Sequence, residues 1–390
     1  MLHKVGLLPA DNYQQVPFAY KMYTRTDTLG WEQSDAFKET FSADVDIEFM
    51  GVWDTVDSVG LIPRRLPFTT SNTIVRTFRH AVALDERRAK FKANLWHRPT
   101  TEEEHLGLHE TDSRLTTDSP LPLHVKELDR LRPVHSRASS LRTPKESGQE
   151  RKLAKFERIY SQKERRPTDI EEVWFAGCHS DIGGGSVPNK TRHSLARISL
   201  RWMVRECFKA NTGIMFDSHA LRKIGLDPST LFPYVTPRPS AMSAHSEAYQ
   251  KLRTPTFTQR VASVFKKKGK KVKPGPIAKA NGHRNLDINE ELEDLQDALS
   301  PVYDQLRIVR SWWVLEVIPS SIRFQNADNE WITYFSSNLA RPRIIPSQDG
   351  IIKVHRTVQL RMEANPPVDS KKRRHYTPRA RFSVEPTWID

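Results

Sequence analysis

The sequence predicts an α/β fold, with a mostly parallel sheet flanked by helices, and two apolar runs of strand length carry this prediction. Residues 45–53 (VDIEFMGVW) first alternate apolar and acidic side chains and then lose their polarity, as in a strand that becomes buried on both faces. Residues 173–176 (VWFA) predict a second buried strand, and apolar residues at helical spacing follow it in 195–207, with Ser194 as the predicted N-cap. Strands that lead into helical patterns in this way favour an α/β fold over an all-helical or all-β one.

Each predicted strand ends in a polar residue that can do chemistry. Asp54 follows the first strand, and His179 and Asp181 follow the second. Three successive glycines come next: Gly183, Gly184 and Gly185. Open α/β sheets place ligands and catalytic groups at the carboxyl ends of their strands, and glycines there allow a sharp turn or a positive φ. From these residues alone, Asp54 and His179 are either members of a site or polar residues that cap turns.

The composition sets limits on the core and on the partners. With 390 residues, 37% of them hydrophobic, the chain is too polar to be packed throughout, so we expect one core interrupted by solvated segments. The formal net charge of +14 favours anionic partners, such as phospholipid headgroups, nucleic acid or acidic proteins. The sequence shows neither a secretory signal nor a membrane-spanning run, so we expect a soluble cytoplasmic protein. The two cysteines, Cys178 and Cys207, predict reduced and buried thiols.

Helices are predicted near the N-terminus. Residues 1–8 have the pattern of the end of a helix, because Leu2 and Val5 are at helical spacing and Gly6 follows them. Residues 16–23 predict an amphipathic helix with four residues on its core face: Val16, Ala19, Tyr20 and Tyr23.

A further helix is predicted after residue 70, capped by Ser71 or Asn72. Four apolar residues share one face of it: Ile74, Phe78, Ala81 and Val82. We interpret Arg79, His80 and the charged cluster 85–88 (DERR) mainly as solvated or salt-bridged surface residues. The alternative is that they help to shape a site.

The organisation that we expect is a single domain over residues 1–364, with a polar C-terminal tail at 365–390. Two polar insertions, at about 97–168 and 237–285, show no sustained apolar period, and we expect them to be disordered. The second insertion contains the basic run Lys266–Lys273, which is interpreted as a solvated loop and leaves nuclear entry open. Outside the insertions, residues 311–319 (SWWVLEVIP) predict a buried segment, and the stretch from Ile351 predicts short elements that return to the domain.

The chain resembles a known family, and four blocks carry the resemblance: GVWDTVDSVG at 51–60, RHAVALDERR at 79–88, EVWFAGCHSDIGGG at 172–185 and SLARISLRWM at 194–203. Together they are similar to the α/β-hydrolase-like catalytic domain family that includes the first class of type VI secretion phospholipase effectors, and to its fungal-type members. The first 23 residues also resemble the helical region that follows the nucleophile in that family. The segments WWVLEVIP and VHRTV resemble its closing part.

The resemblance implies an α/β-hydrolase-like fold and a Ser–Asp–His triad that cleaves acyl esters of phospholipids or related lipids. Matched position by position, Asp54 is the triad acid and His179 the general base, with Asp181 and the three glycines as supporting residues. An imidazole can take the proton of the serine and return it to the leaving group, while a buried carboxylate fixes the imidazole tautomer. The resemblance implies no cofactor and no metal.

The chain departs from the family at the nucleophile. Members carry a G-F-S-R-G elbow, but no two of the 16 glycines here are four residues apart, so the sequence contains no G-x-S-x-G. We therefore expect an N-terminally shortened domain that is inactive as it stands. Ser180 and Ser58 lack an elbow, and Cys178 lies in an apolar run, so none of them is a good replacement. His355 is a weaker candidate for the base because no glycine-rich strand exit surrounds it.

Two other functions are open at this stage. A non-catalytic binding protein on the same fold would use basic loops, such as Lys266–Lys273, to bind an anionic membrane or nucleic acid. Of these two partners, we do not expect nucleic acid. Asp54, His179 and Asp181 could instead hold a metal for hydrolysis, but the ligand spacings typical of such sites are missing. The sequence leaves the oligomeric state undetermined.

Overall fold

The structure is a computed structural model that describes residues 1–25, 27–56, 75–96, 168–243, 245, 289–325, 331–346, 351–364 and 375–390. The two predicted insertions fall almost entirely outside these residues. Ser58 and the basic run Lys266–Lys273 also lie outside the described part.

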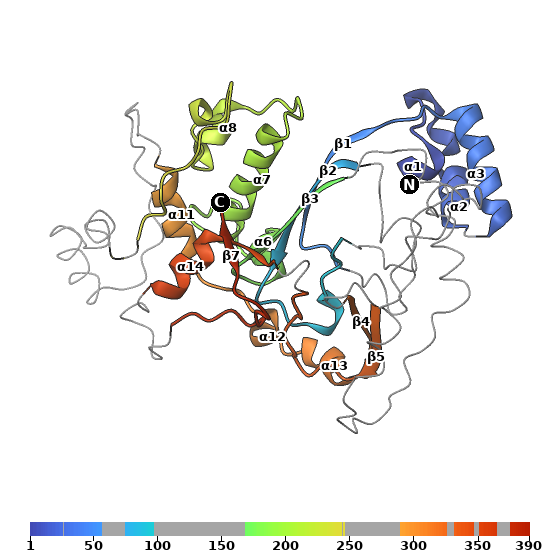
Figure 1. Cartoon of the computed structure of the whole chain (residues 1–390). Helices are drawn as coiled ribbons and strands as arrows, with labels where there is room; N and C mark the ends of the chain where they lie inside the picture. The colour runs from blue at the N-terminus through green and yellow to red at the C-terminus, as the bar shows by residue number, and fades with distance from the viewer. Residues whose placement is uncertain are drawn as a thin grey trace, which may run out of the picture.

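In the described residues, five parallel strands form a central sheet in the order β1-β2-β3-β6-β7 (Figure 1). The strands are β1 (Ile47–Trp53), β2 (Val75–Ala83), β3 (Asp169–Phe175), β6 (Lys353–His355) and β7 (Thr387–Ile389). A separate antiparallel hairpin is formed by β4 (Ser320–Gln325) and β5 (Trp331–Ser336). The predicted α/β class, with a mostly parallel sheet flanked by helices, is confirmed.

Helices pack on both faces of this sheet. The helices are α1 (Leu2–Val5), α2 (Val16–Thr24), α3 (Thr28–Phe41), α6 (His179–Ile182), α7 (Ala196–Lys209), α8 (Ser218–Lys223), α11 (Glu290–Ala298), α12 (Gln305–Ile308), α13 (Trp312–Val317) and α14 (Arg356–Glu363). On one face, Phe175 and Val173 of β3 pack against Trp202 of α7. On the other face, Trp174 packs in a cluster that includes Val358 of α14. Because strands buried on both faces must be apolar on both, the short run VWFA of β3 shows no alternation.

The N-terminal helices form a cluster of their own. Val5, Ala19, Met22, Tyr23 and Phe37 pack together, and Figure 1 shows α1, α2 and α3 side by side near the start of β1. The helix predicted at 16–23 is confirmed, with one change in its core face. Met22 is buried there, whereas Val16 and Tyr20 are exposed.

The helix predicted after residue 70 is wrong, because Val75–Ala83 is strand β2 at the centre of the sheet, between β1 and β3. The segment is buried on both faces, so its apolar residues fit a helical period by coincidence. The surface assignment of Arg79, His80 and the cluster 85–88 is also wrong, because most of these residues are buried, although the expected salt bridges are present at Arg79, Arg87 and Arg88. Arg79 and His80 are both buried, and their side chains have acidic partners: Arg79 Nε lies 2.6 Å from Glu206 of α7, and His80 Nδ1 lies 2.8 Å from Glu172 of β3.

Two further expectations are corrected by the structure. Residues 311–319 are not a buried segment: α13 exposes Trp313, Val314 and Val317, and Glu316 is its buried residue. Residues 375–390 are not a polar tail outside the domain, because β7 pairs with β6 and completes the sheet. Within the described part of the chain, no helix combines the length and the apolar character needed to span a bilayer.

Candidate active site

The candidate site lies where three neighbouring parallel strands end. Asp54 follows β1, residues 84–86 follow β2, and His179 follows β3 by four residues. The three strand ends are joined by backbone hydrogen bonds, from Asp54 N–H to Ala81 O and from Asp85 N–H to Gly177 O. Parallel strands put their carboxyl ends at one edge of the sheet, which explains how residues far apart in sequence meet here.

Asp54 and His179 are brought together by this arrangement. Asp54 is completely buried, and its Oδ2 lies 2.7 Å from Nδ1 of His179. Its Oδ1 accepts a hydrogen bond of 2.8 Å from the backbone N–H of Ala83, at the end of β2. The backbone of Asp54 has a φ of 45°, a left-handed conformation that aspartate adopts more readily than most residues. The carboxylate is therefore held against the neighbouring strand end.

Arg343, which follows the β4–β5 hairpin, supplies the charge opposite Asp54. Its Nη2 donates to Asp54 Oδ2 over 2.9 Å, and its Nη1 donates to Oδ1. Complete burial acts to raise the pKa of Asp54, but the positive charge of Arg343 and the hydrogen bonds from His179, Arg343 and Ala83 outweigh it and hold this pKa well below its usual range. Asp54 is thus an ionised carboxylate that can only accept, so Nδ1 of His179 carries a hydrogen.

Phe91 contacts the ring of His179, and Glu86 holds its backbone. The ring of Phe91 meets it edge to face, with centroids 4.9 Å apart. The backbone N–H of His179 donates to Oε2 of Glu86 over 3.2 Å, and Glu86 is itself paired with Arg88. The side chain nevertheless keeps 30% of its surface exposed. A histidine fixed at Nδ1 and open to solvent has the geometry that a general base requires.

The supporting residues that the sequence suggested have structural roles. Oδ2 of Asp181 accepts hydrogen bonds from the backbone N–H of Cys178 and of Tyr303, and so fixes the turn into α6. Gly183 ends α6, and Gly184 and Gly185 have φ values of 88° and 94°, in the region that favours glycine. Within the described residues, Asp181 does not join Asp54 and His179 in a group of three potential metal ligands.

The environments of the other candidate residues do not suit them to be a nucleophile or a base. Burial raises the pKa of Cys178 far above its usual range, and the thiol donates to the carbonyl oxygen of Asp85, so it is not a reactive thiolate. His355 is also buried, where it caps α14 and stacks on Phe175 with centroids 4.9 Å apart. Ser180 is the second residue of α6, and no strand-to-helix elbow surrounds it.

An apolar cavity of about 530 Å³ lies beside Arg343, the partner of Asp54, and neither Asp54 nor His179 lines it. Arg343 lines it, so one guanidinium contacts both the cavity and the carboxylate of Asp54. Most of its other walls are apolar or aromatic: Leu95, Ile322, Phe324, Tyr334, Ile344, Ile345 and Phe382. A cavity of this size and character suits a small apolar ligand or an acyl chain.

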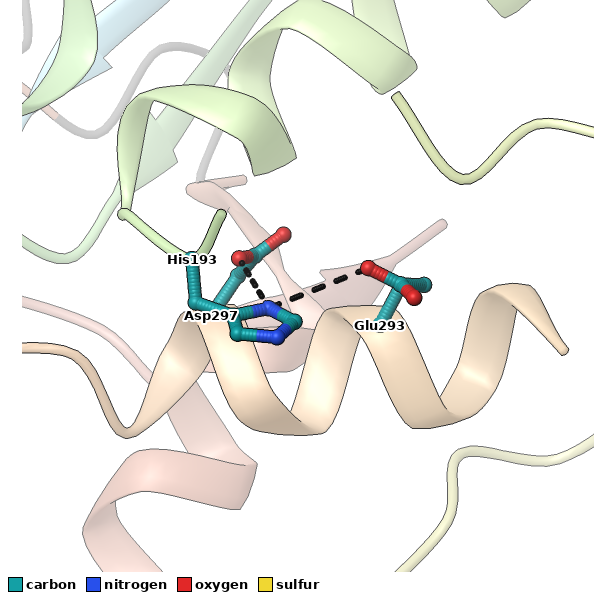
Figure 2. A group of neighbouring side chains, drawn as sticks. All are labelled: His193, Glu293 and Asp297. Atoms are coloured by element: carbon teal, nitrogen blue, oxygen red, sulfur yellow. Dashed lines mark hydrogen bonds and ion pairs between the residues drawn. The ribbon is translucent and has the colours of Figure 1, made fainter. Parts of the chain in front are cut away.

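A second polar cluster joins the loop before α7 to α11 (Figure 2). His193 points at two carboxylates of α11, with its Nδ1 3.2 Å from Asp297 Oδ1 and 3.8 Å from Glu293 Oε2. Three oxygens of these carboxylates already have donors: Arg192 on Glu293, and Arg201 and the Ser194 N–H on Asp297. The cluster therefore has the character of an ion-pair network that fastens the loop to the helix.

Sequence reasoning missed two residues of the site. Arg343 lies 289 positions after Asp54, and nothing in its local sequence signals a partner for a buried carboxylate. Phe91 follows the DERR cluster in a segment without a clear period. Glu86 belongs to that cluster, and a charged residue just after a strand was the sequence feature that could have identified it as part of the site.

Comparison with known proteins gives a family match. The model of the family described as "T6SS, Phospholipase effector Tle1-like, catalytic domain" matches residues 1–206. The chain is also similar to the uncharacterized protein YEL023C of Saccharomyces cerevisiae, with 26% identity over 435 aligned residues that cover 93% of this chain. The chain spans 62% of the length of that relative. No solved structure matches the chain significantly.

Proposed function

Because that family model covers residues 1–206, the chain belongs to the family of Tle1-like catalytic domains of type VI secretion phospholipase effectors, and we propose that Asp54 and His179 are the acid and base of an ester-hydrolysing triad. The observation that carries the proposal is the 2.7 Å contact between Oδ2 of a fully buried Asp54 and Nδ1 of a partly exposed His179. In the reaction proposed here, a serine attacks the carbonyl carbon of a lipid acyl ester.

The roles follow from the protonation states. Asp54 stays ionised and accepts a hydrogen bond from Nδ1–H of His179. In the neutral ring, Nε2 of His179 therefore carries no hydrogen. Nε2 can then take the proton of the serine hydroxyl as the hydroxyl attacks, and Asp54 stabilises the imidazolium that results. His179 next returns the proton to the leaving alcohol. A water molecule, activated by the same nitrogen, hydrolyses the acyl-enzyme.

The apolar cavity supports a substrate with an acyl chain. It is lined by Arg343, which holds Asp54, so a chain bound there would be one side chain away from the acid of the pair. Its volume of about 530 Å³ accommodates part of a lipid tail but not a whole phospholipid. We propose that the cavity binds the acyl side of the ester, with the headgroup left outside.

The serine is the missing member of the triad. The sequence contains no G-x-S-x-G motif, and the buried thiol of Cys178 is unsuited to replace the serine. We therefore propose that residues 1–390 by themselves form no acyl-enzyme. The base and its orienting carboxylate have no nucleophile to activate in that state.

A turnover assay tests this proposal with vesicular phospholipid and short acyl esters as substrates. Residues 1–390 alone should show no turnover, whereas an extended chain that carries an in-frame, glycine-flanked serine should hydrolyse both substrates. In the extended chain, His179→Ala should reduce kcat by at least about 10³-fold. His193→Ala is a matched control, since His193 is similarly exposed and also paired with an aspartate. Turnover that survives His179→Ala would refute the assignment of the base.

The alternative is a non-catalytic binding protein on the same fold, and the missing serine elbow favours it. Such a protein would bind anionic membrane or nucleic acid through basic loops such as Lys266–Lys273. Binding that weakens steeply with salt and is lost on deletion of that run, in a chain that stays inactive when extended, would support this alternative.

A further inference from the structure

An exposed apolar face lies on α12, α13 and the turn between them. It consists of Ile308, Val309, Trp313, Val314, Val317 and Ile318, all with at least a third of their surface exposed. Val314 and Val317 keep 62% and 59% of their surface exposed, although they lie one turn apart on the same side of α13. This α12–α13 apolar face is contiguous in the chain, and apolar residues that gather in this way mark a surface that meets another phase or partner.

Basic residues border the α12–α13 apolar face. Arg307, Arg310 and Arg341 are exposed, Arg307 with 72% of its side-chain surface. Arg307 lies 3.5 Å from Asp304, but that buried carboxylate also pairs with Arg87 and Arg379, so the positive charge is in excess.

In the described residues of this stretch, exposed negative charge is lacking. Among the described residues from Gln305 to Pro346, the acidic residue is Glu316, and it is only 1% exposed. Its carboxylate accepts hydrogen bonds from Asn338 and from the backbone N–H groups of Ala89 and Ala340. The exposed charges of this described stretch are therefore positive.

The α12–α13 apolar face is connected to the candidate site by two aromatic rings. On its inner side, the ring of Trp312 meets the ring of Phe91 with centroids 5.6 Å apart. Phe91 in turn contacts the ring of His179. Arg341 also lines the apolar cavity. A body that covers the face would thus lie close to both the histidine and the cavity.

We propose that the α12–α13 apolar face docks onto the surface of an anionic phospholipid bilayer. Valine and isoleucine side chains would enter the acyl boundary, Trp313 would lie at the headgroup level, and the arginines would contact anionic headgroups. This inference rests on the proposed function in one respect: docking would present His179 and the cavity to lipid esters. The docking itself does not require catalysis.

The charges on this face decide between a bilayer and other partners. A second copy of the chain, related by a twofold axis, would bring the same arginines face to face and be repelled. Nucleic acid would contact the arginines but leave the six apolar side chains without a favourable partner. An anionic bilayer satisfies both the apolar residues and the positive border.

A vesicle co-sedimentation experiment with the full chain tests the proposal. The probes are vesicles of phosphatidylcholine with about one third phosphatidylserine, and vesicles of phosphatidylcholine alone. Val314→Asp and Arg310→Glu should each weaken binding to the anionic vesicles by about tenfold, because one places a charge in the acyl boundary and the other reverses a headgroup contact. Met215→Asp and Arg222→Glu are matched controls at exposed positions beside α8, and they should bind as the wild type does.

The outcomes separate docking from catalysis. Docking that depends on Val314 and Arg310 supports the inference even if no ester is cleaved, and in that case only the proposed function fails. Unchanged binding of the Val314→Asp protein would overturn the inference, as would binding that disappears only when Lys266–Lys273 is deleted. Self-association that Val314→Asp abolishes, without vesicle binding by the wild type, would assign the face to a second copy. Circular dichroism and thermal unfolding confirm that each variant is folded.

Discussion

The buried pair of Asp54 and Arg343 makes the candidate site dependent on a residue that takes no part in the proposed chemistry. Both groups are almost fully buried, and Arg343 also donates to the carbonyl oxygens of Ala83 and Phe91. Arg343→Met should lower the free energy of unfolding by about 3–5 kcal/mol, because it leaves a buried carboxylate without its guanidinium partner and with only the hydrogen bonds from His179 and Ala83. Urea unfolding measures this effect.

Two control variants separate the charge from the site. Arg341→Met, at an exposed position two residues away, should change the free energy of unfolding by less than about 0.5 kcal/mol. Asp54→Asn combined with Arg343→Met should recover part of the loss, since both charges are then removed. Equal effects of Arg341→Met and Arg343→Met would contradict this account.

At the scale of single residues, the sequence could predict one half of the site. Asp54 and His179 each follow an apolar run, and parallel strands bring such positions to the same edge. Arg343 and Phe91 could not be found in this way, because they come from connecting segments whose positions depend on long-range packing. A polar residue at a strand end has a local signal, whereas the counter-ion of a buried carboxylate has none.

At the scale of elements, the junction of β6 and α14 should make stability depend on pH. Burial lowers the pKa of His355 from 6.5 to about 3, even though Asp294 acts to raise it. The unfolded chain therefore takes up a proton below pH 6.5 that the folded chain does not, so stability is complete above this pH and falls as the pH drops towards 3. We expect a slope of up to about 1.4 kcal/mol per pH unit from this residue.

His355→Asn tests this dependence. Asparagine keeps a side-chain acceptor at the N-cap of α14, where His355 accepts from the N–H of Thr357, but it removes the titrating ring. Urea unfolding from neutral to mildly acidic pH should show a shallower slope than the wild type. His219→Asn, at an exposed histidine of α8, should keep the wild-type slope. Asp54 and Asp294, whose pKa values are lowered, lose their contribution progressively below about pH 5, so the slopes are compared between about pH 7 and 5.

Two elements show why local pattern was insufficient. The run Val75–Ala83 has apolar residues at helical spacing and no alternation, and pairing with β1 and β3 makes it a strand buried on both faces. In α13, high apolar content predicted burial, but burial requires another element to cover the residues, and the fold covers Glu316 and leaves Val314 and Val317 exposed. Hydrophobicity alone therefore identified the segment but not its surroundings.

At the scale of the whole molecule, the last residues of the chain close the sheet, although their polar composition suggested a tail. Tyr376 donates its hydroxyl hydrogen to Asp85 over 2.7 Å, and the N–H of Arg379 donates to the other oxygen of the same carboxylate. β7 then pairs with β6, and Asp390 lies 2.8 Å from Arg238. A strand of three residues carries too little local pattern to be predicted, and its position depends on an edge that other strands have already formed.

A chain that ends at Ala364 should consequently lose its stable fold. The truncation removes the Tyr376 hydroxyl and the Arg379 N–H from Asp85, a buried carboxylate that keeps the N–H of Gly177 as a donor, and it exposes the edge of β6. We expect a loss of at least about 3 kcal/mol in the free energy of unfolding, visible as a lower thermal midpoint and as aggregation. Tyr376→Phe, which removes only the hydroxyl contact with Asp85, should cost about 1–2 kcal/mol and leave the chain folded. If the truncated chain unfolds with the midpoint of the full chain, β7 is dispensable, and the domain ends at Ala364 as its polar composition first suggested.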